Sequence, residues 1–284
     1  MVSNEGARTG GVAGANRFSP IWLWLSIGAA LLAIAGSLAG LFAPSIYSSL
    51  TAAFLPQAIA QDTANLMLVS PLMIVLAALA LRNSLRAYLL WVGVVTFTVY
   101  NYVIYTFSIP FGYLFPLWVA VLGLSVYALI GGIATASHEA IRASYSRPER
   151  VKVTAWVLII VALFFAFVWL SEDVPALLAG TAPASVIAMA LPTNPVHILD
   201  LAFFLPAVII TGVMLIKRVS LGYTLAPAFL VFLVLTGVPI LLTPVVQPLI
   251  DQVPAWGVAL PIGLLTLILV VIVGWLVDSI RDKL

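Results

Sequence analysis

The stretch Pro192-Thr-Asn-Pro-Val-His-Ile-Leu-Asp200 leads straight into Leu201-Ala-Phe-Phe-Leu-Pro206. The apolar run then continues to residue 216, where Lys217 and Arg218 end it. About 20 apolar residues suffice for a helix to cross a bilayer. The run over 196–216 therefore predicts a membrane-spanning helix that has basic residues at one end.

The other end of this predicted span carries Asn194, His197 and Asp200. An ionisable side chain inside a bilayer is costly and is a functional candidate by default. His197 and Asp200 are three residues apart, so they share one face of a helix. This polar end of the predicted span is the first candidate site in the sequence.

The composition makes lipid the solvent of this chain. Of its 284 residues, 63% are hydrophobic and only 8% are charged, and the mean hydropathy is +1.20. A soluble domain has about 25% charged residues. The lipid bilayer is thus the expected partner. Because there is no cysteine, disulfides, thiol nucleophiles, iron–sulfur clusters and cysteine-ligated zinc are excluded.

Further apolar runs of spanning length predict an all-α, polytopic transmembrane helix bundle. With the run at 196–216 they make eight spans, within one transmembrane domain over 19–284 that follows a flexible cytoplasmic tail over 1–18. The other seven runs cover 20–42, 63–81, 87–107, 113–136, 153–171, 222–243 and 256–277.

The positive charges orient the bundle. With eight spans, every Lys and Arg falls on one side, which the positive-inside rule makes cytoplasmic. Both termini are then cytoplasmic, and a miscounted span would scatter the charges over both faces. This arrangement also accounts for the pI of about 9.0, so we predict no nucleic-acid partner. The twelve residues are Arg8, Arg17, Arg82, Arg86, Arg142, Arg147, Arg150, Lys152, Lys217, Arg218, Arg281 and Lys283.

A weak internal repeat suggests two four-helix halves, 19–140 and 150–284. Arg82-Asn-Ser-Leu85 resembles Arg218-Val-Ser-Leu221, and each follows an apolar run that contains a proline, Pro71 or Pro206. Parallel repeats of this kind occur among transporters. The alternative is chance similarity between short apolar segments.

Three predicted spans place polar groups in the outer leaflet. Their spacing puts Asp62 with Asn65, and Asn101 with Tyr105, on shared helix faces. We expect these spans to form one outward-facing pocket for a small solute or a proton. The alternative is interhelical hydrogen bonding that only holds the spans together. The predicted pocket consists of Asp62, Asn65, Tyr100, Asn101, Tyr105, Asn194, His197 and Asp200.

Other chemistries have weaker patterns. If a metal were bound, its ligands would be His197, Asp200 and Asp62, but the usual multi-histidine signature is absent, and no metal or other cofactor is predicted. Ser185 has no nucleophile-elbow pattern around it, and no phosphate loop or dinucleotide fingerprint occurs. Glu172 and Asp173 are interpreted as a solvated helix end and Trp169 as an interfacial residue.

The motifs at Gln61-Asp62, at Tyr100-Asn-Tyr102 with Tyr105, and at Pro192–Asp200, with Leu221-Gly-Tyr223 following, resemble a group of bacterial multi-pass membrane proteins without an assigned function. The resemblance covers roughly 61–240. It implies a bacterial inner (plasma) membrane location and supplies no substrate, cofactor or catalytic residue.

The leading functional interpretation is a small-solute or proton-coupled transporter-like protein, and enzymatic activity is not favoured. A His–carboxylate pair suits proton coupling because histidine changes charge near neutral pH. Two alternatives stay open: a membrane-embedded metal-dependent hydrolase that uses the same residues, and an accessory or sensory subunit. The sequence predicts no particular oligomer or partner subunit.

Overall fold

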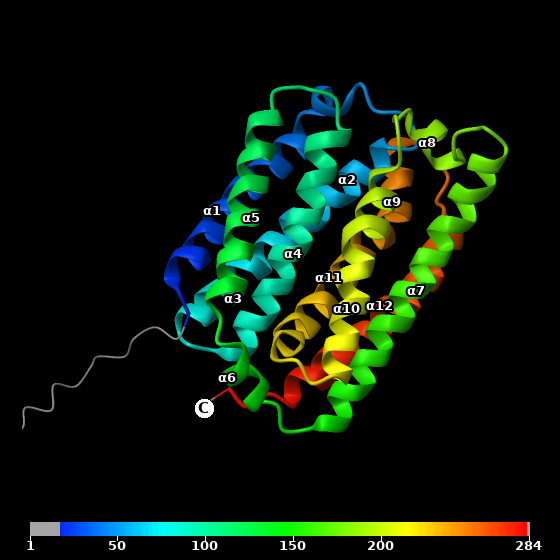
Figure 1. Ribbon diagram of the computed structural model, residues 1–284. Coiled ribbons are helices and arrows are strands. Elements are labelled where there is room, and N and C mark those ends of the chain that lie inside the picture. The colour runs from blue at the N-terminus through cyan, green and yellow to red at the C-terminus, as the bar shows by residue number, and fades with distance from the viewer. Residues whose placement is uncertain (1–17, 283–284) are drawn as a thin grey trace, which may run out of the picture.

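A computed structural model describes residues 18–282 as a bundle of helices (Figure 1). Eight of its helical segments are long and apolar enough to cross a membrane, which confirms the predicted all-α, eight-span fold. The predicted tail is 1–18, and all of it except Phe18 lies outside the described residues. The eight segments are α1 (Pro20–Phe42), α2–η2–α3 (Leu55–Leu81), α4 (Leu85–Ser108), α5 (Phe115–Thr135), α7 (Pro148–Leu178), α9–η3–α10 (Pro195–Ile216), α11 with η4 (Ser220–Ile250) and α12 (Trp256–Asp278).

Proline sets the beginning of many of these helices. Its fixed φ and missing N–H suit the first helical turn, where the N–H has no partner in any case. Pro56 begins the second span at Leu55, eight residues before the predicted start at 63. Asp62 therefore lies about 10 Å along this span from its first residue, at 1.5 Å per residue. The predicted start at 63 would have placed Asp62 at the end of the span.

The connections at the end of the bundle opposite the basic residues contain short helices. A 3-10 turn, η1 (Pro44–Tyr47), precedes the second span. The fifth span, α7, runs on to Leu178, beyond the predicted end at 171, and is followed by α8 (Ala184–Met189). As a result Glu172 and Asp173 belong to a helix that packs beside the sixth span (Figure 1).

The centre of the bundle is the pair α4 and α11, which pack against each other. Of the eight spans, α4 is the most buried and α12 the least. Trp91 of α4 is fully buried and donates its Nε1–H to Ser26 Oγ of α1 at 2.8 Å. Such a hydrogen bond removes the cost of an unpaired indole N–H in an apolar interior.

The end of the bundle that carries the basic residues is closed by a C-terminal strap, Ser279–Asp282. Figure 1 shows α6 (His138–Ala143), the α3–α4 turn and the C-terminal end together at this inner end. Arg86 donates from Nε and an Nη to the carbonyl oxygen of Ile280 at 2.8 and 2.7 Å. The Arg281 N–H donates to Ser144 O at 3.0 Å, and the Ser146 N–H donates to Ser279 O at 2.9 Å.

The second and sixth spans are both interrupted by a π-helical turn. These turns are η2 (Asn65–Val69) and η3 (Asp200–Phe204). The C-cap of each turn is the residue before a proline, Pro71 or Pro206. The backbone N–H of that residue donates to the carbonyl oxygen five residues earlier. Because proline offers no N–H, an upstream carbonyl loses its α-helical donor, and the wider turn occurs at that place.

Candidate functional site

Asp62 is the centre of a first polar group, on α2 (Leu55–Ala64). Its side chain is 1% exposed, and its two carboxylate oxygens accept hydrogen bonds from Tyr47 Oη at 2.6 Å and Tyr105 Oη at 2.9 Å. Burial, and then the neighbouring carboxylate of Asp62, raise the pKa of Tyr47 well above its usual value. The Tyr47 hydroxyl therefore keeps its proton and remains a donor to Asp62.

Gly40 of α1 leaves the room for this carboxylate. A Cβ atom added at Gly40 would lie 2.1 Å from Asp62 Oδ2 and 2.8 Å from Tyr47 Oη. Real Cβ atoms do not approach other atoms so closely. The close contact between α1 and the second span thus depends on glycine at this position.

Asn65 forms a second contact between this span and α4. Its Oδ1 accepts hydrogen bonds from Gln61 Nε2 at 3.0 Å and from Asn101 Nδ2 at 3.3 Å. Its own Nδ2 is buried without a hydrogen-bond partner in the structure. Asp62 and Asn65 are therefore both joined to α4, through Tyr105 and Asn101.

Asp200, at the start of η3, is the centre of the other polar group. Its side chain is 6% exposed, and Trp169 of α7 donates Nε1–H to its Oδ2 at 2.8 Å. The Tyr100 hydroxyl lies near the same carboxylate without forming a hydrogen bond of good geometry. The Tyr100 ring packs edge-on against Phe204, with ring centroids 5.0 Å apart.

His197, on α9 (Pro195–Leu199), completes this group. Its Nδ1 lies 2.9 Å from Asp173 Oδ1, and its Nε2 lies 3.8 Å from Glu172 Oε2. The imidazole stacks on the Trp169 indole, with centroids 4.5 Å apart and an interplanar angle of 28°. One tryptophan thus contacts both the histidine and, through its N–H, the carboxylate of Asp200.

Asn194 positions His197. Its Oδ1 caps α9 by accepting from the backbone N–H groups of Val196 at 3.0 Å and His197 at 3.3 Å. An asparagine side chain is among the best N-caps for a helix. Its Nδ2 donates to Ser185 Oγ of α8 at 3.0 Å, so the cap also ties α8 to the sixth span.

A cavity of about 530 Å³ opens beside His197. Its polar lining is Asp173, Thr193, Asn194 and His197. Its remaining wall is aliphatic or proline, from the connections on either side of α8, from α8 itself and from the sixth span: Ala182, Pro183, Val186, Pro192, Ile198, Leu201 and Ala202. A pocket with apolar walls and a few converging polar groups is the usual form of a small-molecule site.

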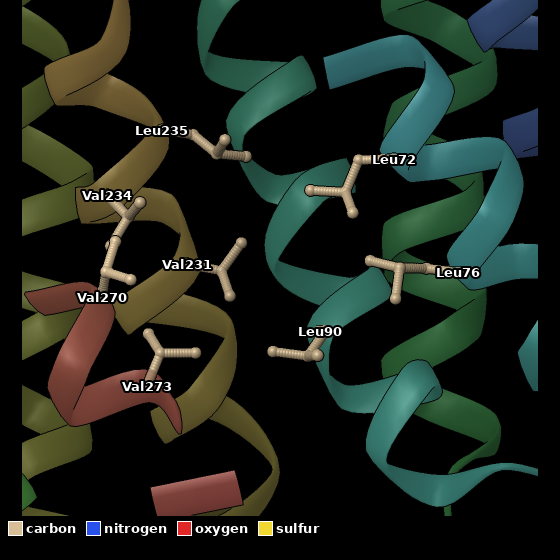
Figure 2. A pocket seen from close by; sticks show the side chains of 8 residues that line it. All are labelled: Leu72, Leu76, Leu90, Val231, Val234, Leu235, Val270 and Val273. Atoms are coloured by element: carbon tan, nitrogen blue, oxygen red, sulfur yellow. The ribbon is translucent and has the colours of Figure 1, made fainter. Parts of the chain in front are cut away.

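Another hollow, of about 200 Å³, has no polar group. Figure 2 shows aliphatic side chains from α3 (Ser70–Leu81), α4, α11 and α12 around it. Nothing in this lining offers a hydrogen bond or a charge. It does not belong to the candidate site. Its lining residues are Leu72, Leu76, Leu90, Val231, Val234, Leu235, Val270 and Val273.

The residues predicted for one pocket thus form two hydrogen-bonded groups. The first contains Asp62, Asn65, Asn101 and Tyr105, and the second contains Asn194, His197 and Asp200, with Tyr100 beside it. The cavity touches Asn194 and His197 alone of the predicted set. One shared chamber stays a prediction.

Three contributors to these groups were missed or given another role by the sequence reasoning. Trp169 and Asp173 hold the second group, although they were interpreted as an interfacial residue and a solvated helix end. Tyr47 of η1 holds the first. The spacing of Trp169, Glu172 and Asp173 at the end of an apolar run was the available signal.

The metal set suggested by the sequence is not assembled. Among the described residues, no three His, Asp or Glu side chains are grouped so that they could hold a metal ion. Asp62 accepts from two tyrosines, whereas His197 and Asp200 contact α7. The metal-dependent hydrolase therefore has no arrangement of ligands in its favour.

Fold and site together define a multi-pass helical membrane protein with eight candidate spans and a polar cavity at one end. No protein-family model, curated protein or solved structure matches the chain. The resemblance to a bacterial membrane-protein group thus stays a prediction.

Proposed function

We propose that this protein is a proton-coupled transporter of a small solute, in which the cavity beside His197 is the outward-facing binding site. The observation that carries this proposal is the position of His197, whose imidazole forms part of the cavity wall while it contacts Asp173. Histidine changes charge near neutral pH, so a solute in the cavity and a proton on the ring affect each other directly.

Asp200 gives the proton a second location. The Trp169 indole lies against the His197 ring and donates to the Asp200 carboxylate. One rigid side chain therefore fixes the positions of His197 and Asp200, so a proton on His197 and a charge on Asp200 affect one another. Buried carboxylates in membrane spans commonly belong to proton pathways.

The internal repeat supports the class of protein. Asn65 and Asp200, which begin the π turns, are separated by 135 residues, as are Pro71 and Pro206. Asn83 and Arg218 keep the same separation, and both have a left-handed backbone, with φ of 67° and 58°. We propose that the halves 19–140 and 150–284 are parallel repeats, as in several transporter folds.

We place this transporter in the bacterial inner membrane. Two observations support this: the basic residues collect at one end of the bundle, as the positive-inside rule requires of the cytoplasmic side, and the sequence motifs resemble bacterial proteins. The cavity, at the other end, then opens away from the cytoplasm.

The test is proton movement in liposomes that contain the purified protein and an internal pH-sensitive dye. When candidate solutes are added outside, the correct one should change the internal pH. Asp200→Asn should abolish this signal while the thermal unfolding of the protein stays cooperative. Asp251→Asn, at the same end of the bundle but outside the cavity lining, is the matched control and should transport normally. Solute uptake that Asp200→Asn leaves unchanged would refute proton coupling through this residue.

A further inference from the structure

The charge around the cavity indicates what kind of solute it takes. Asp173 lines the cavity with a side chain that is 31% exposed, and Glu172, 33% exposed, lies on the same helix turn. Asp200 accepts a hydrogen bond from Trp169, whose ring also stacks on His197. Among the contacts of the described residues, His197 is the only titratable cationic partner of the acidic groups near this cavity.

No fixed positive charge balances these carboxylates. Every described Lys and Arg lies at the inner end, on or beside the α3–α4 turn, the α6–α7 region, the α10–α11 turn and the C-terminal strap (Figure 1). An anionic solute would meet no arginine or lysine at the cavity with which to form a charge-assisted hydrogen bond. The cavity therefore has a negative potential whenever His197 is neutral.

Apart from Thr193, Asn194 and His197, the rest of the wall is apolar. Val186, Ile198 and Leu201 offer aliphatic surface, and Asn194 already uses its amide to cap α9 and to bind Ser185. Few free hydrogen-bonding groups remain for a sugar or another polyhydroxylated solute. Apolar walls around a carboxylate fit a solute that has one positive charge on an apolar body.

We infer that the cavity binds a small monovalent organic cation, such as a protonated amine or a quaternary ammonium, whose charge lies beside Asp173 and Glu172. This inference rests on the proposed function, for which it names the substrate class. Without the cation, a protonated His197 neutralises the charge of Asp173. The bound cation replaces the protonated imidazole as the positive partner of Asp173.

The same geometry makes cation and proton competitors. The titratable groups that face His197 are Asp173 and Glu172 from α7 and Asp200 from η3, and Tyr100 of α4 lies beside Asp200. When His197 is protonated, its charge pairs with Asp173, and a second positive charge is repelled. Binding of the cation therefore weakens as the pH falls.

The test is equilibrium binding to the full-length protein in lipid nanodiscs, measured by calorimetry. The probes are choline, benzyltrimethylammonium and the neutral analogue of choline in which carbon replaces the quaternary nitrogen. Both cations should bind more tightly than the neutral analogue, and benzyltrimethylammonium more tightly than choline because of the apolar walls. Asp173→Asn should weaken cation binding by about tenfold or more, since it removes the nearest charge.

Two controls sharpen the result. Asp251→Asn makes the same chemical change outside the cavity lining and should leave affinity unchanged. His197→Gln should remove the loss of affinity at low pH. Equal affinity for choline and its neutral analogue, or unchanged cation binding in folded Asp173→Asn protein, would overturn the inference.

These outcomes are distinct from those of the transport test. Proton-coupled uptake of a neutral solute would leave the proposed function intact and refute the cationic substrate. Selective cation binding without any flux would support the cationic ligand and refute the proposed transport function.

Discussion

The indole of Trp169 lies against the imidazole of His197, with ring centroids 4.5 Å apart. The indole N–H donates a hydrogen bond to the Asp200 carboxylate. Two residues three positions apart on the sixth span are thus held by one side chain of the fifth. The contact explains why the buried carboxylate is tolerated in a membrane span: it has a fixed donor.

Replacing Trp169 by phenylalanine should separate the two roles of this side chain. The Phe ring can still stack on His197, but Asp200 loses its donor, which should cost about 1–3 kcal/mol of unfolding free energy. The proton-coupled signal should also change its pH profile. Thermal unfolding and the liposome assay measure these effects. Trp256→Phe, at a half-exposed tryptophan of the outer end, is the control. Unchanged stability and pH profile in the Trp169 variant would show that the donor is dispensable.

Gly40→Ala should destabilise the protein. The new methyl group would lie 2.1 Å from Asp62 Oδ2, so the carboxylate must leave Tyr47 or α1 must shift. We expect a loss of about 1–3 kcal/mol, as for other overpacked sites. The matched control is Gly28→Ala on the same helix, where the nearest atom, Leu124 Cδ1, is 4.0 Å away. There the better helix propensity of alanine should maintain or slightly raise stability. Equal effects of the two substitutions would contradict the close contact at Gly40.

Pro206→Ala should affect function more than folding. Alanine supplies the N–H that proline lacks, which allows η3 to tighten toward an α-helix and turns Asp200 away from Trp169. Cation affinity and proton coupling should both fall while the helix content seen by circular dichroism is kept. Pro261→Ala, inside α12, is the control for removing a proline from a span. A fully active Pro206 variant would show that the π turn has no part in positioning Asp200.

Stability should depend on pH through His138. Its Nδ1 lies 2.8 Å from Thr224 Oγ1, and burial lowers its pKa from 6.5, an effect that the neighbouring Glu139 partly opposes. The unfolded chain then binds more protons than the folded one, so His138 costs stability as the pH falls through 6.5 toward the lower pKa of the folded state. The melting temperature of His138→Gln should decline less over this range than that of the wild type. Parallel melting curves would argue against a lowered pKa.

Sidedness can be tested with single cysteines, because the natural sequence has none. Thr181→Cys, in the exposed connection between α7 and α8, should react with a membrane-impermeant maleimide added to intact cells. Ser137→Cys, at the exposed start of α6, should react only after the cells are opened. The reverse pattern would invert the orientation that the basic residues predict.

The fold could be predicted from the sequence because lipid leaves few alternatives. An apolar run must satisfy its own backbone hydrogen bonds, so its length alone identifies a span. The boundaries were harder to predict where apolar residues continue past the membrane. Pro56 begins the second span earlier than its hydropathy suggests, and this moves Asp62 from the mouth into the interior.

The candidate site was predicted in part, for a different reason. Asp62, His197 and Asp200 stand out because charge is rare in an apolar chain, but their partners depend on which helices are neighbours. The pairing of His197 with Asp173 joins residues 24 positions apart, and no local pattern encodes it. The π turns were not predicted, because Pro71 and Pro206 alone are compatible with a kink, a bulge or a helix start.

The C-terminal strap has a consequence for how the chain is made. Arg86, near the start of the third span, finds its strap partners in Ile280 and Asp282, and Ser144, before the fifth span, finds its strap partner in Arg281. All eight spans must therefore be synthesised before this end of the bundle can close. Until the eighth span has left the ribosome, this end of the earlier spans lacks these bonds.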